Sequence, residues 1–196
     1  MESLVNILHD DGLMTSNLKL QIQQKLQTRH LAKSTMLQKQ GDTACKCYFV
    51  KTGLLRSYAI DEKGKEHIFM FAPEGWIMGD IVALASSKPS DLYIDVLETS
   101  EVEVFTKDIF EILFSSTAAS GKTINTLLLN RNAVLQKRVI MLMSATALER
   151  YEDFLEIYPN IAQRIPQKMI ASYLGITPEA LSKIRHDRSK LHSPTS

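Results

Sequence analysis

The 196-residue chain is poor in the residues that build metal centres and disulfide frameworks. Cys45 and Cys47 are its only cysteines; two thiols cannot hold an iron–sulfur cluster by themselves, and no histidine or cysteine lies at zinc-finger spacing. In a strand the two side chains share one face of the sheet, and buried, reduced thiols are favoured over a redox switch. We therefore expect no bound metal and no cofactor.

Long apolar runs are also missing, and none approaches the length that crosses a bilayer. The opening residues, MESLVNILHDDG, lack the basic segment of a secretory signal, so we expect a cytoplasmic protein that makes no contact with a membrane. With 44% hydrophobic and 23% charged residues, the composition is that of a folded globular protein.

Acidic residues are scarce near the end of the chain. From Ile161 onward there are six basic and two acidic residues, a net charge of +4; the whole chain carries +1, so residues 1–160 carry −3. The six basic residues are Arg164, Lys168, Lys183, Arg185, Arg188 and Lys190. A basic end of this kind suits a polyanion such as nucleic acid, and a solvated basic tail is the alternative.

The apolar pattern changes its period along the chain. A short helix is predicted over residues 18–26, and strand-like runs follow between residues 47 and 105. The predicted strands are 47–50, 54–60, 67–71, 93–97 and 102–105, joined by turns that include 51–53, 61–64, 72–75 and 98–101. Short strands at this spacing favour a small antiparallel barrel or sandwich.

Beyond residue 106 the spacing becomes helical. A short helix is predicted over 108–114 and a longer one from about residue 120 into the 140s. The apolar seam of the long helix consists of Ile124, Leu127, Leu128, Val134, Leu135, Met141 and Leu142, interrupted by Arg131 and Arg138. A small barrel cannot cover so long a seam, so we expect a two-fold homodimer paired along this helix; packing within the chain is the alternative.

The segment IPQKMIASYLGITPEALSKIR, near the end of the chain, predicts two helices joined by a tight turn. Pro166 suits the first turn of a helix, Ala171 is small where helices cross closely, and Gly175 supplies a left-handed residue. Thr177 and Pro178 suit the N-cap and the first position of the second helix. This combination is typical of a helix-turn-helix, which places its second helix in the major groove of DNA. A purely structural helix pair shares the apolar spacing but does not explain the turn residues.

With this order of elements, and with that C-terminal segment above all, the chain resembles the Crp/Fnr family of bacterial transcription regulators. The barrel segment GLLRSYAIDEKGKEHIFMFAPEGWIMGDIVALASSKPSDLYIDV is similar to the family's run of turn, strand, short helix and strand. The resemblance implies an α+β fold: a small antiparallel β-barrel or jelly roll like a cyclic-nucleotide-binding domain, a long dimerisation helix and a helix-turn-helix. The expected domains are a sensor barrel with flanking helices (1–117), the dimerisation helix (118–146) and a DNA-binding domain (147–196).

The resemblance also locates the region where cyclic-nucleotide-binding members hold the phosphate, here Gly79, Asp80, Ile81, Ser90 and Asp91. In those members backbone N–H groups of a short helix, a Glu after the Gly, and an Arg followed by Ser or Thr bind the ligand. Here Asp80 stands in place of the Glu, and Ser90-Asp91 in place of the Arg pair. A carboxylate where a cation is needed opposes a phosphodiester, so we expect no cyclic AMP binding. The barrel then senses an unknown small-molecule effector or nothing.

In the C-terminal segment the resemblance implies that Thr177, Pro178 and Glu179 open a recognition helix whose polar face includes Ser182 and Lys183. Glu179 can accept a hydrogen bond from cytosine, and Lys183 can donate to guanine. Pro178 stands where the family often has Arg, so we expect a different sequence preference. Contacts to DNA phosphates are expected from Lys168, Arg185 and Arg188.

Two functions from different classes remain open on the sequence. The first is a dimeric regulator, not an enzyme, that binds double-stranded DNA and contacts RNA polymerase. The second is a barrel that binds a small molecule or acts as an enzyme, with C-terminal helices that serve only for dimerisation. The basic end of the chain and the run Thr177-Pro178-Glu179 favour the first, because they have no role in the second.

Overall fold

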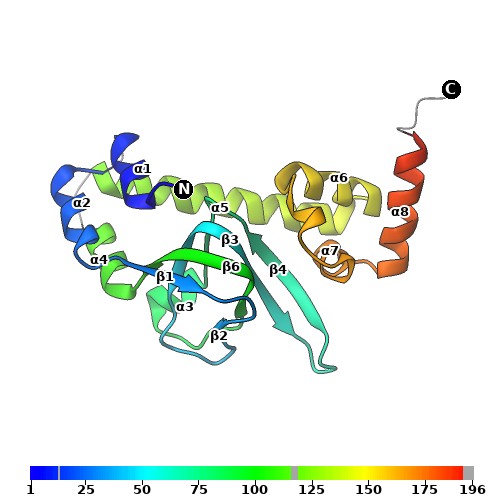
Figure 1. The fold of residues 1–196 in the computed structure, drawn as a ribbon, viewed down its shortest axis with the longest axis horizontal. Coiled ribbons are helices and arrows are strands. Elements are labelled where there is room, and N and C mark those ends of the chain that lie inside the picture. Colours follow the sequence, from blue (N-terminus) through cyan, green and yellow to red (C-terminus); the bar gives the residue numbers. More distant parts are fainter. Residues whose placement is uncertain (13, 116–118, 192–196) are drawn as a thin grey trace.

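The computed structural model describes residues 1–12, 14–115 and 119–191; for 114, 115, 119–128, 130, 131, 190 and 191 it describes the backbone alone. Within this part of the chain, six strands form one antiparallel sheet, and helices lie at both ends of it (Figure 1). The α+β class predicted from the sequence is confirmed. No helix among the described residues is long and apolar enough to span a bilayer.

The sheet is built around two long strands. Its strands are β1 (Gln27–Leu31), β2 (Met36–Gln38), β3 (Cys47–Ile60), β4 (Glu66–Ala72), β5 (Ile77–Gly79) and β6 (Tyr93–Phe105). The order is β1-β6-β3-β4, with β2 paired to β6 and β5 paired to β3. Runs of consecutive buried residues in β3 and β6 show that both faces of these two strands are covered.

Helices lie at both ends of the sheet and along one side of it (Figure 1). They are α1 (Leu4–Asp10), α2 (Ser16–Gln23), α3 (Ile81–Ser86), α4 (Lys107–Ser115), α5 (Ala119–Ser144), α6 (Ala147–Ile157), the 3₁₀ turn η1 (Ile161–Gln163), α7 (Gln167–Leu174) and α8 (Pro178–Leu191). In Figure 1, α5 runs along one side of the barrel from the N-terminal helices to α6, and α8 stands at the far end. We refer to α6, η1, α7 and α8 together as the C-terminal unit.

Two of the predicted turns are wrong, because 51–53 and 98–101 lie inside β3 and β6 and pair with each other. Thr52 is the register partner of Glu101, and Leu54 is the partner of Glu98, with shifts in register on either side. Gly53 absorbs the irregularity at φ +97°, and a Cβ there would lie only 2.1 Å from the Oγ of Ser100. A glycine that looks like a turn in the sequence therefore serves as a bulge, where the two backbones approach closely.

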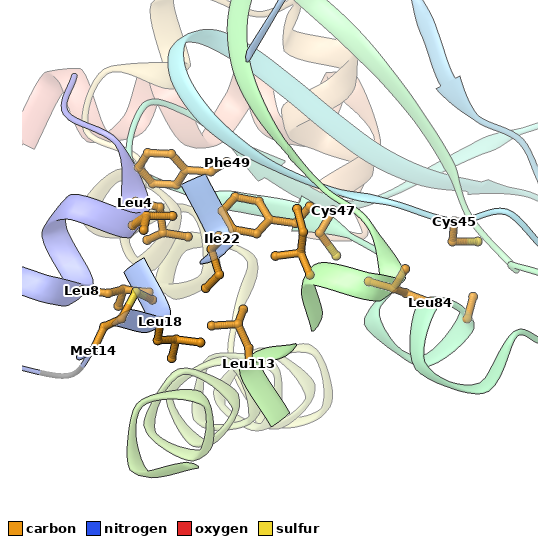
Figure 2. Packing of buried hydrophobic residues seen from close by; sticks show 14 residues of the cluster. Leu4, Leu8, Met14, Leu18, Ile22, Cys45, Cys47, Phe49, Leu84 and Leu113 are labelled. Atoms are coloured by element: carbon orange, nitrogen blue, oxygen red, sulfur yellow. The ribbon is translucent and has the colours of Figure 1, made fainter. Parts of the chain in front are cut away.

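Three apolar clusters are found among the described side chains. One fills the barrel around Val50, Leu55 and Val102. A second joins α1, α2, α3 and α4 to the start of β3 and the end of β6, and it contains both cysteines (Figure 2). The third runs from β3 and β4 into α6, α7 and α8, so the barrel and the C-terminal unit share one core. Its buried members are Leu54, Tyr58, Ile68, Phe71, Tyr151, Phe154, Tyr158, Ile161, Ile165, Ile170, Ala171, Tyr173, Leu174 and Leu181.

Candidate nucleic-acid interface

The predicted helix pair is present as α7 and α8. Gly175 ends α7 in the left-handed region at φ +68°, where a side chain would be strained. Thr177 Oγ1 accepts a hydrogen bond from the N–H of Ala180 (3.2 Å), and Pro178 is the first residue of α8. Pro166 lies at the N-cap of α7, just before the first helical turn in which we expected it. Local turn chemistry alone therefore predicted this pair correctly.

The packing of the pair leaves one face of α8 in solvent. Ala171 and Leu181 are buried between the helices, and Ala180 and Ile184 are half-buried beside them. On the opposite side Thr177, Pro178, Glu179, Ser182 and Lys183 are all exposed. We call these five residues the reading face. They lie at the N-terminal end of α8, the end that enters the groove in a helix-turn-helix.

Glu179 is held as a carboxylate on this face. Its own backbone N–H and then the side chain of Thr177 donate hydrogen bonds to it and lower its pKa. An ionised carboxylate accepts hydrogen bonds and donates none. Lys183 lies four residues further on, so it shares the same side of the helix and supplies donors. The reading face therefore offers an acceptor and a donor one turn apart.

The basic residues near the end of the chain do not all lie on this side. Lys168 is exposed on α7, and Arg185 and Arg188 are half-buried on α8. Arg164 instead turns to the barrel, where it pairs with Glu74 and Glu98. The +4 counted from the sequence therefore overstates the charge available to a polyanion, because one of the six cations is neutralised within the fold. Lys190 has its side chain outside the described part of the chain.

Two of the residues expected to hold an effector, Asp80 and Ser90, are hydrogen-bonded to each other. Asp80 caps α3: its Oδ1 accepts from the N–H of Ala83 (3.0 Å), and its Oδ2 accepts from the hydroxyl of Ser90 (2.8 Å). Ser90 is only 1% exposed, and its oxygen accepts from the side-chain amide of Gln38 (2.6 Å) and from the N–H of Leu92 (3.1 Å). We call residues 79–91 the cassette. Its two central polar side chains already bind each other.

The rest of the cassette is equally closed to an anion. Gly79 is required by close packing, because a Cβ there would lie 2.3 Å from the Sγ of Cys47. Ile81 is half-buried, and Asp91 is exposed with a carboxylate rather than a cation. A cyclic nucleotide needs a positive partner for its phosphate and free N–H groups at the helix start. The carboxylate of Asp80 already accepts a hydrogen bond from one of these N–H groups, that of Ala83. The residues present therefore do not fit a cyclic nucleotide.

The two cysteines behave as core residues. Cys47 is fully buried, and Cys45 is 7% exposed, with its Sγ donating to the carbonyl of Asp42 (3.3 Å). Burial, and then the charges of Asp80 and Asp42, raise the pKa of the Cys45 thiol, which therefore stays protonated near neutral pH. In the described residues, no group of three or more His, Cys, Asp or Glu side chains is arranged to hold a metal ion.

The long helix α5 has two distinct faces in its C-terminal half. Arg138 turns to the chain's own β4 and α7: its guanidinium donates to the carbonyls of Ile68 (2.9 Å) and Tyr173 (3.1 Å) and also to that of Phe69. Leu142, one turn further, lies 3.4 Å from the Cβ position of Gly175. This face of α5 therefore packs within the chain.

The seam predicted for dimerisation lies around Arg138. Val134, Leu135, Met141 and Leu142 stand three or four residues from Arg138 and thus share its face. Leu135 and Met141 are half-buried, and Val134 and Leu142 are 40% and 42% exposed. The remaining seam residues, Ile124, Leu127 and Leu128, have side chains outside the described part of the chain.

A second apolar face of α5, which the seam analysis missed, points to solvent. Leu129, Val139, Ile140 and Met143 are 66%, 55%, 53% and 83% exposed. Leu129, Ile140 and Met143 are separated by eleven and three residues, so they fall within one narrow sector of a helix. That spacing was visible in the sequence, but only the position of Arg138 tells which of the two faces is already covered.

The sequence of this chain is similar to one known domain family and to individual bacterial proteins. The model of the cyclic nucleotide-binding domain family matches residues 28–117. The anaerobic regulatory protein of Aggregatibacter actinomycetemcomitans is 29% identical over 168 residues, which cover 79% of this chain and 63% of that protein. The fumarate and nitrate reduction regulatory protein of Vibrio cholerae is 27% identical over 179 residues, which cover 83% of this chain and 70% of that protein.

Solved structures share the fold over most of the chain. FixK2 from Bradyrhizobium japonicum superposes with a TM-score of 0.74 at 18% identity, covering 87% of this chain and 89% of its own. A structure described as a transcriptional regulator of the Crp/Fnr family from Eubacterium rectale gives 0.71 at 19% identity, covering 93% and 87%. The chain spans only 63% and 60% of the first two curated relatives, both named anaerobic regulatory protein.

Proposed function

We propose that the chain is a cytoplasmic DNA-binding transcription regulator of the Crp/Fnr family and not an enzyme. The observation that carries the proposal is the exposed reading face at the start of α8, with Glu179 and Lys183 one turn apart. In a helix-turn-helix, the N-terminal residues of the second helix meet base edges in the major groove. Double-stranded DNA is the proposed partner.

Each side chain of the reading face has a distinct role in this proposal. Glu179 accepts a hydrogen bond from the amino group of a cytosine, and Lys183 donates to O6 or N7 of a guanine. Ser182 adds a hydroxyl that reaches either a base or a phosphate, and Thr177 caps α8 and holds Glu179. Pro178 has no side-chain donor, so the base pair that it faces contributes little to specificity.

The neighbouring cations bind the DNA backbone rather than bases. Lys168 is exposed on α7, and Arg185 and Arg188 are half-buried further along α8. Contacts of this kind position the protein and make its affinity depend on salt, but they carry no sequence information.

Two chains pair along α5 in the proposed regulator. The exposed apolar residues Leu129, Val139, Ile140 and Met143 support this pairing, because a monomer would leave them in water. Pairing about a two-fold axis would separate the two α8 helices by about 34 Å, one turn of DNA, and so select a near-palindromic site. Contact with RNA polymerase bound beside that site belongs to the same proposal.

The barrel of the regulator does not respond to cyclic AMP or cyclic GMP. Ser90 is hydrogen-bonded to both Asp80 and Gln38, and Asp91 repels a phosphate. A fold can keep a pocket's architecture after it has lost the ligand chemistry of its relatives. Any effector of this protein is therefore of another chemical class.

The proposal is tested by gel-shift titration of the full chain with duplexes selected from a random-sequence library, followed by footprinting. We expect a footprint of two half-sites one helical turn apart and a clear preference over unrelated duplex at each salt concentration. Binding that stays equal for all sequences, without a two-part footprint, contradicts the regulator and favours a small-molecule-binding barrel.

A further inference from the structure

The C-terminal unit is attached to the barrel through a shared aromatic core. Phe71 of β4 packs against Phe154, Tyr158 and Tyr173, with ring centroids 6.3, 5.9 and 5.7 Å apart. The hydroxyl of Tyr158 donates to the carbonyl of Phe71 (3.3 Å). Apolar contacts of this kind stabilise docking but are not directional, so they tolerate small rotations of one unit against the other.

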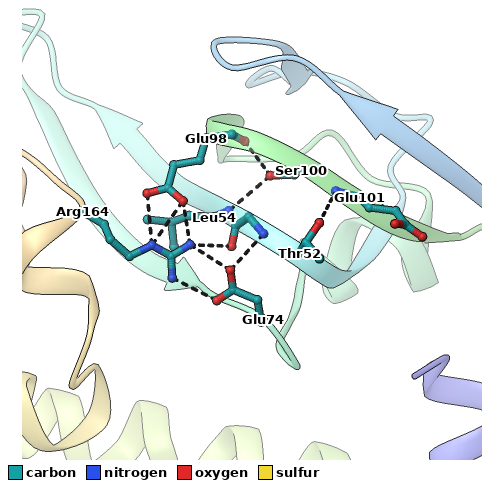
Figure 3. A network of polar contacts seen from close by, with 8 residues as sticks. Thr52, Leu54, Glu74, Glu98, Ser100, Glu101 and Arg164 are labelled. Atoms are coloured by element: carbon teal, nitrogen blue, oxygen red, sulfur yellow. Dashed lines mark hydrogen bonds and ion pairs between the residues drawn. The ribbon is translucent and has the colours of Figure 1, made fainter. Parts of the chain in front are cut away.

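A second attachment lies at the rim of this core and is directional (Figure 3). Arg164 follows η1, and its guanidinium binds three separate segments of the barrel. It donates to both carboxylate oxygens of Glu74 (2.9 Å each), to both of Glu98 (2.7 to 3.2 Å), and to the carbonyl of Gly53 (3.1 Å). We call Arg164, Glu74 and Glu98 the Arg164 cluster. Forked contacts on a planar guanidinium fix both its position and its orientation.

The barrel side of the Arg164 cluster is held by its own hydrogen bonds. Glu74 Oε1 also accepts from the N–H of Gly53 (3.0 Å). The hydroxyl of Ser100 donates to the backbone carbonyl of Glu98 (2.6 Å) and accepts from the N–H of Leu54 (3.2 Å). The hydrogen bonds around the bulge at Gly53 thus fix the positions of the two carboxylates. The guanidinium of Arg164, from the C-terminal unit, binds both of them.

The Arg164 cluster and the reading face lie on different sides of the C-terminal unit. Arg164 is in contact with the barrel, whereas Glu179 and Lys183 are exposed. A third attachment, on α7, is the hydroxyl of Ser172, which accepts from the N–H of Ile68 (3.0 Å) and donates to the carbonyl of Glu66 (2.9 Å). Docking on the barrel therefore leaves the reading face open while it restricts the direction in which α8 points.

We propose that Arg164 is a positioning residue for DNA recognition: it sets the orientation of α8 on the barrel without touching DNA. This inference rests on the proposed function. Once one α8 of a dimer has bound its half-site, the other α8 binds the second half-site at an effective concentration. That effective concentration is highest when the fold already holds the second helix in the required orientation. A looser C-terminal unit lowers that effective concentration. Loss of Arg164 therefore weakens binding to a two-half-site duplex and leaves binding to a single half-site unchanged.

The test compares two duplexes, the site selected by the wild-type full chain and a version that keeps one half-site. Arg164→Gln is expected to lower affinity for the complete site about tenfold or more and to leave the half-site affinity and the salt dependence unchanged. Glu98→Gln changes only the barrel and is expected to shift the same ratio in the same direction. Arg164→Lys keeps the charge but not the forked geometry, and its ratio should fall between wild type and Arg164→Gln.

Hydrogen exchange, measured without DNA, reports the same loosening of the C-terminal unit on the barrel. The backbone N–H of Ile68 is bound to Ser172 across the junction, so its hydrogen exchange follows undocking of the C-terminal unit. We expect faster exchange at Ile68 in Arg164→Gln and in Glu98→Gln. Exchange at residues inside the barrel such as Val50, which is fully buried, serves as the control and should not change.

Two results would overturn the inference. Equal loss of affinity for both duplexes, with a shallower salt dependence, would make Arg164 a phosphate contact. An unchanged ratio in both Arg164→Gln and Glu98→Gln would show that the shared core orients α8 by itself. If the wild-type chain itself shows no preference for the complete site, the proposed function fails instead, so the two failures are distinguishable.

Discussion

The reading face of α8 and the cassette of the barrel contain similar side chains but use them in opposite ways. On α8, Glu179 and Lys183 are exposed to solvent. In the cassette, Asp80 and Ser90 are bound to each other, and Gln38 completes their network. Polar groups that face water can exchange it for a ligand at small cost, whereas a closed network must first lose its own hydrogen bonds. Polar side chains that are exposed on one face of a helix therefore indicate a binding surface. Polar side chains that are hydrogen-bonded to one another indicate a structural role.

Breaking the proposed dimer has the largest expected effect on DNA binding. Ile140→Lys together with Met143→Lys places two charges on the exposed apolar face of α5 and should convert the dimer to a monomer. Because both α8 helices must act together, affinity for the complete site should fall by roughly 10² or more. Analytical ultracentrifugation checks the assembly state. Leu135→Lys tests the seam predicted from the sequence; if it alone dissociates the chain, the dimer uses the face around Arg138.

Removing one donor from the reading face has the next largest effect. Lys183→Ala should weaken binding to the selected site by about 1–3 kcal/mol and relax the preference at one base pair. Competition with duplexes mutated one position at a time measures both. Lys33→Ala, an exposed cation between β1 and β2, is the matched control and should bind like wild type. An equal loss for all duplexes would make Lys183 a phosphate contact.

In the cassette the same kind of deletion should affect stability rather than binding. Ser90→Ala removes a hydroxyl that is 1% exposed and leaves Asp80 and Gln38 without their shared partner. We expect the free energy of unfolding to fall by about 1–3 kcal/mol, as measured by urea denaturation, with unchanged affinity for DNA. Asp91→Asn, at an exposed position, is the control. Unaltered stability of Ser90→Ala would show that the cassette is not a closed network.

Acid should weaken the junction between barrel and C-terminal unit slightly. Burial would raise the pKa of Glu74, but hydrogen bonds from Arg164 and from backbone N–H groups leave that pKa lowered. A carboxyl with a lowered pKa stabilises the fold above the ordinary value of 4.5, and this contribution is lost as pH falls through the folded value. Thermal unfolding as a function of pH should therefore be less acid-sensitive in Glu74→Gln than in wild type. Glu62→Gln, in an exposed turn, should leave the acid sensitivity unchanged.

The smallest expected effect is that of cyclic nucleotides on the barrel, which should be none. Titration calorimetry with cyclic AMP and with cyclic GMP should show no binding heat at micromolar ligand, because Ser90 cannot replace a cation and Asp91 repels the phosphate. A clear isotherm with either nucleotide would mean that the network of Asp80 and Ser90 opens for the ligand.

Much of the candidate site could be predicted from the sequence because it depends on neighbouring residues. Gly175, Thr177 and Pro178 determine a turn through their own backbone preferences, and these do not depend on distant partners. The mistaken turns at 51–53 and 98–101 show the limit of this reasoning. Each resembles a loop when taken alone, and only their pairing across the sheet turns them into bulged strand.

The sequence by itself determined the order of the elements, the two-helix motif with its exposed polar face, and the absence of a basic residue at positions 90 and 91. These features follow from local backbone preferences, from periodicity and from the presence or absence of a charge at one position. Only the tertiary structure decided which face of α5 is already covered and which partners Arg164 takes. Arg164 meets Gly53, Glu74 and Glu98 across more than sixty residues of chain, and no local pattern encodes contacts at that separation. Arg164, which the charge count placed with the basic residues of the DNA-binding end, thus joins the C-terminal unit to the barrel.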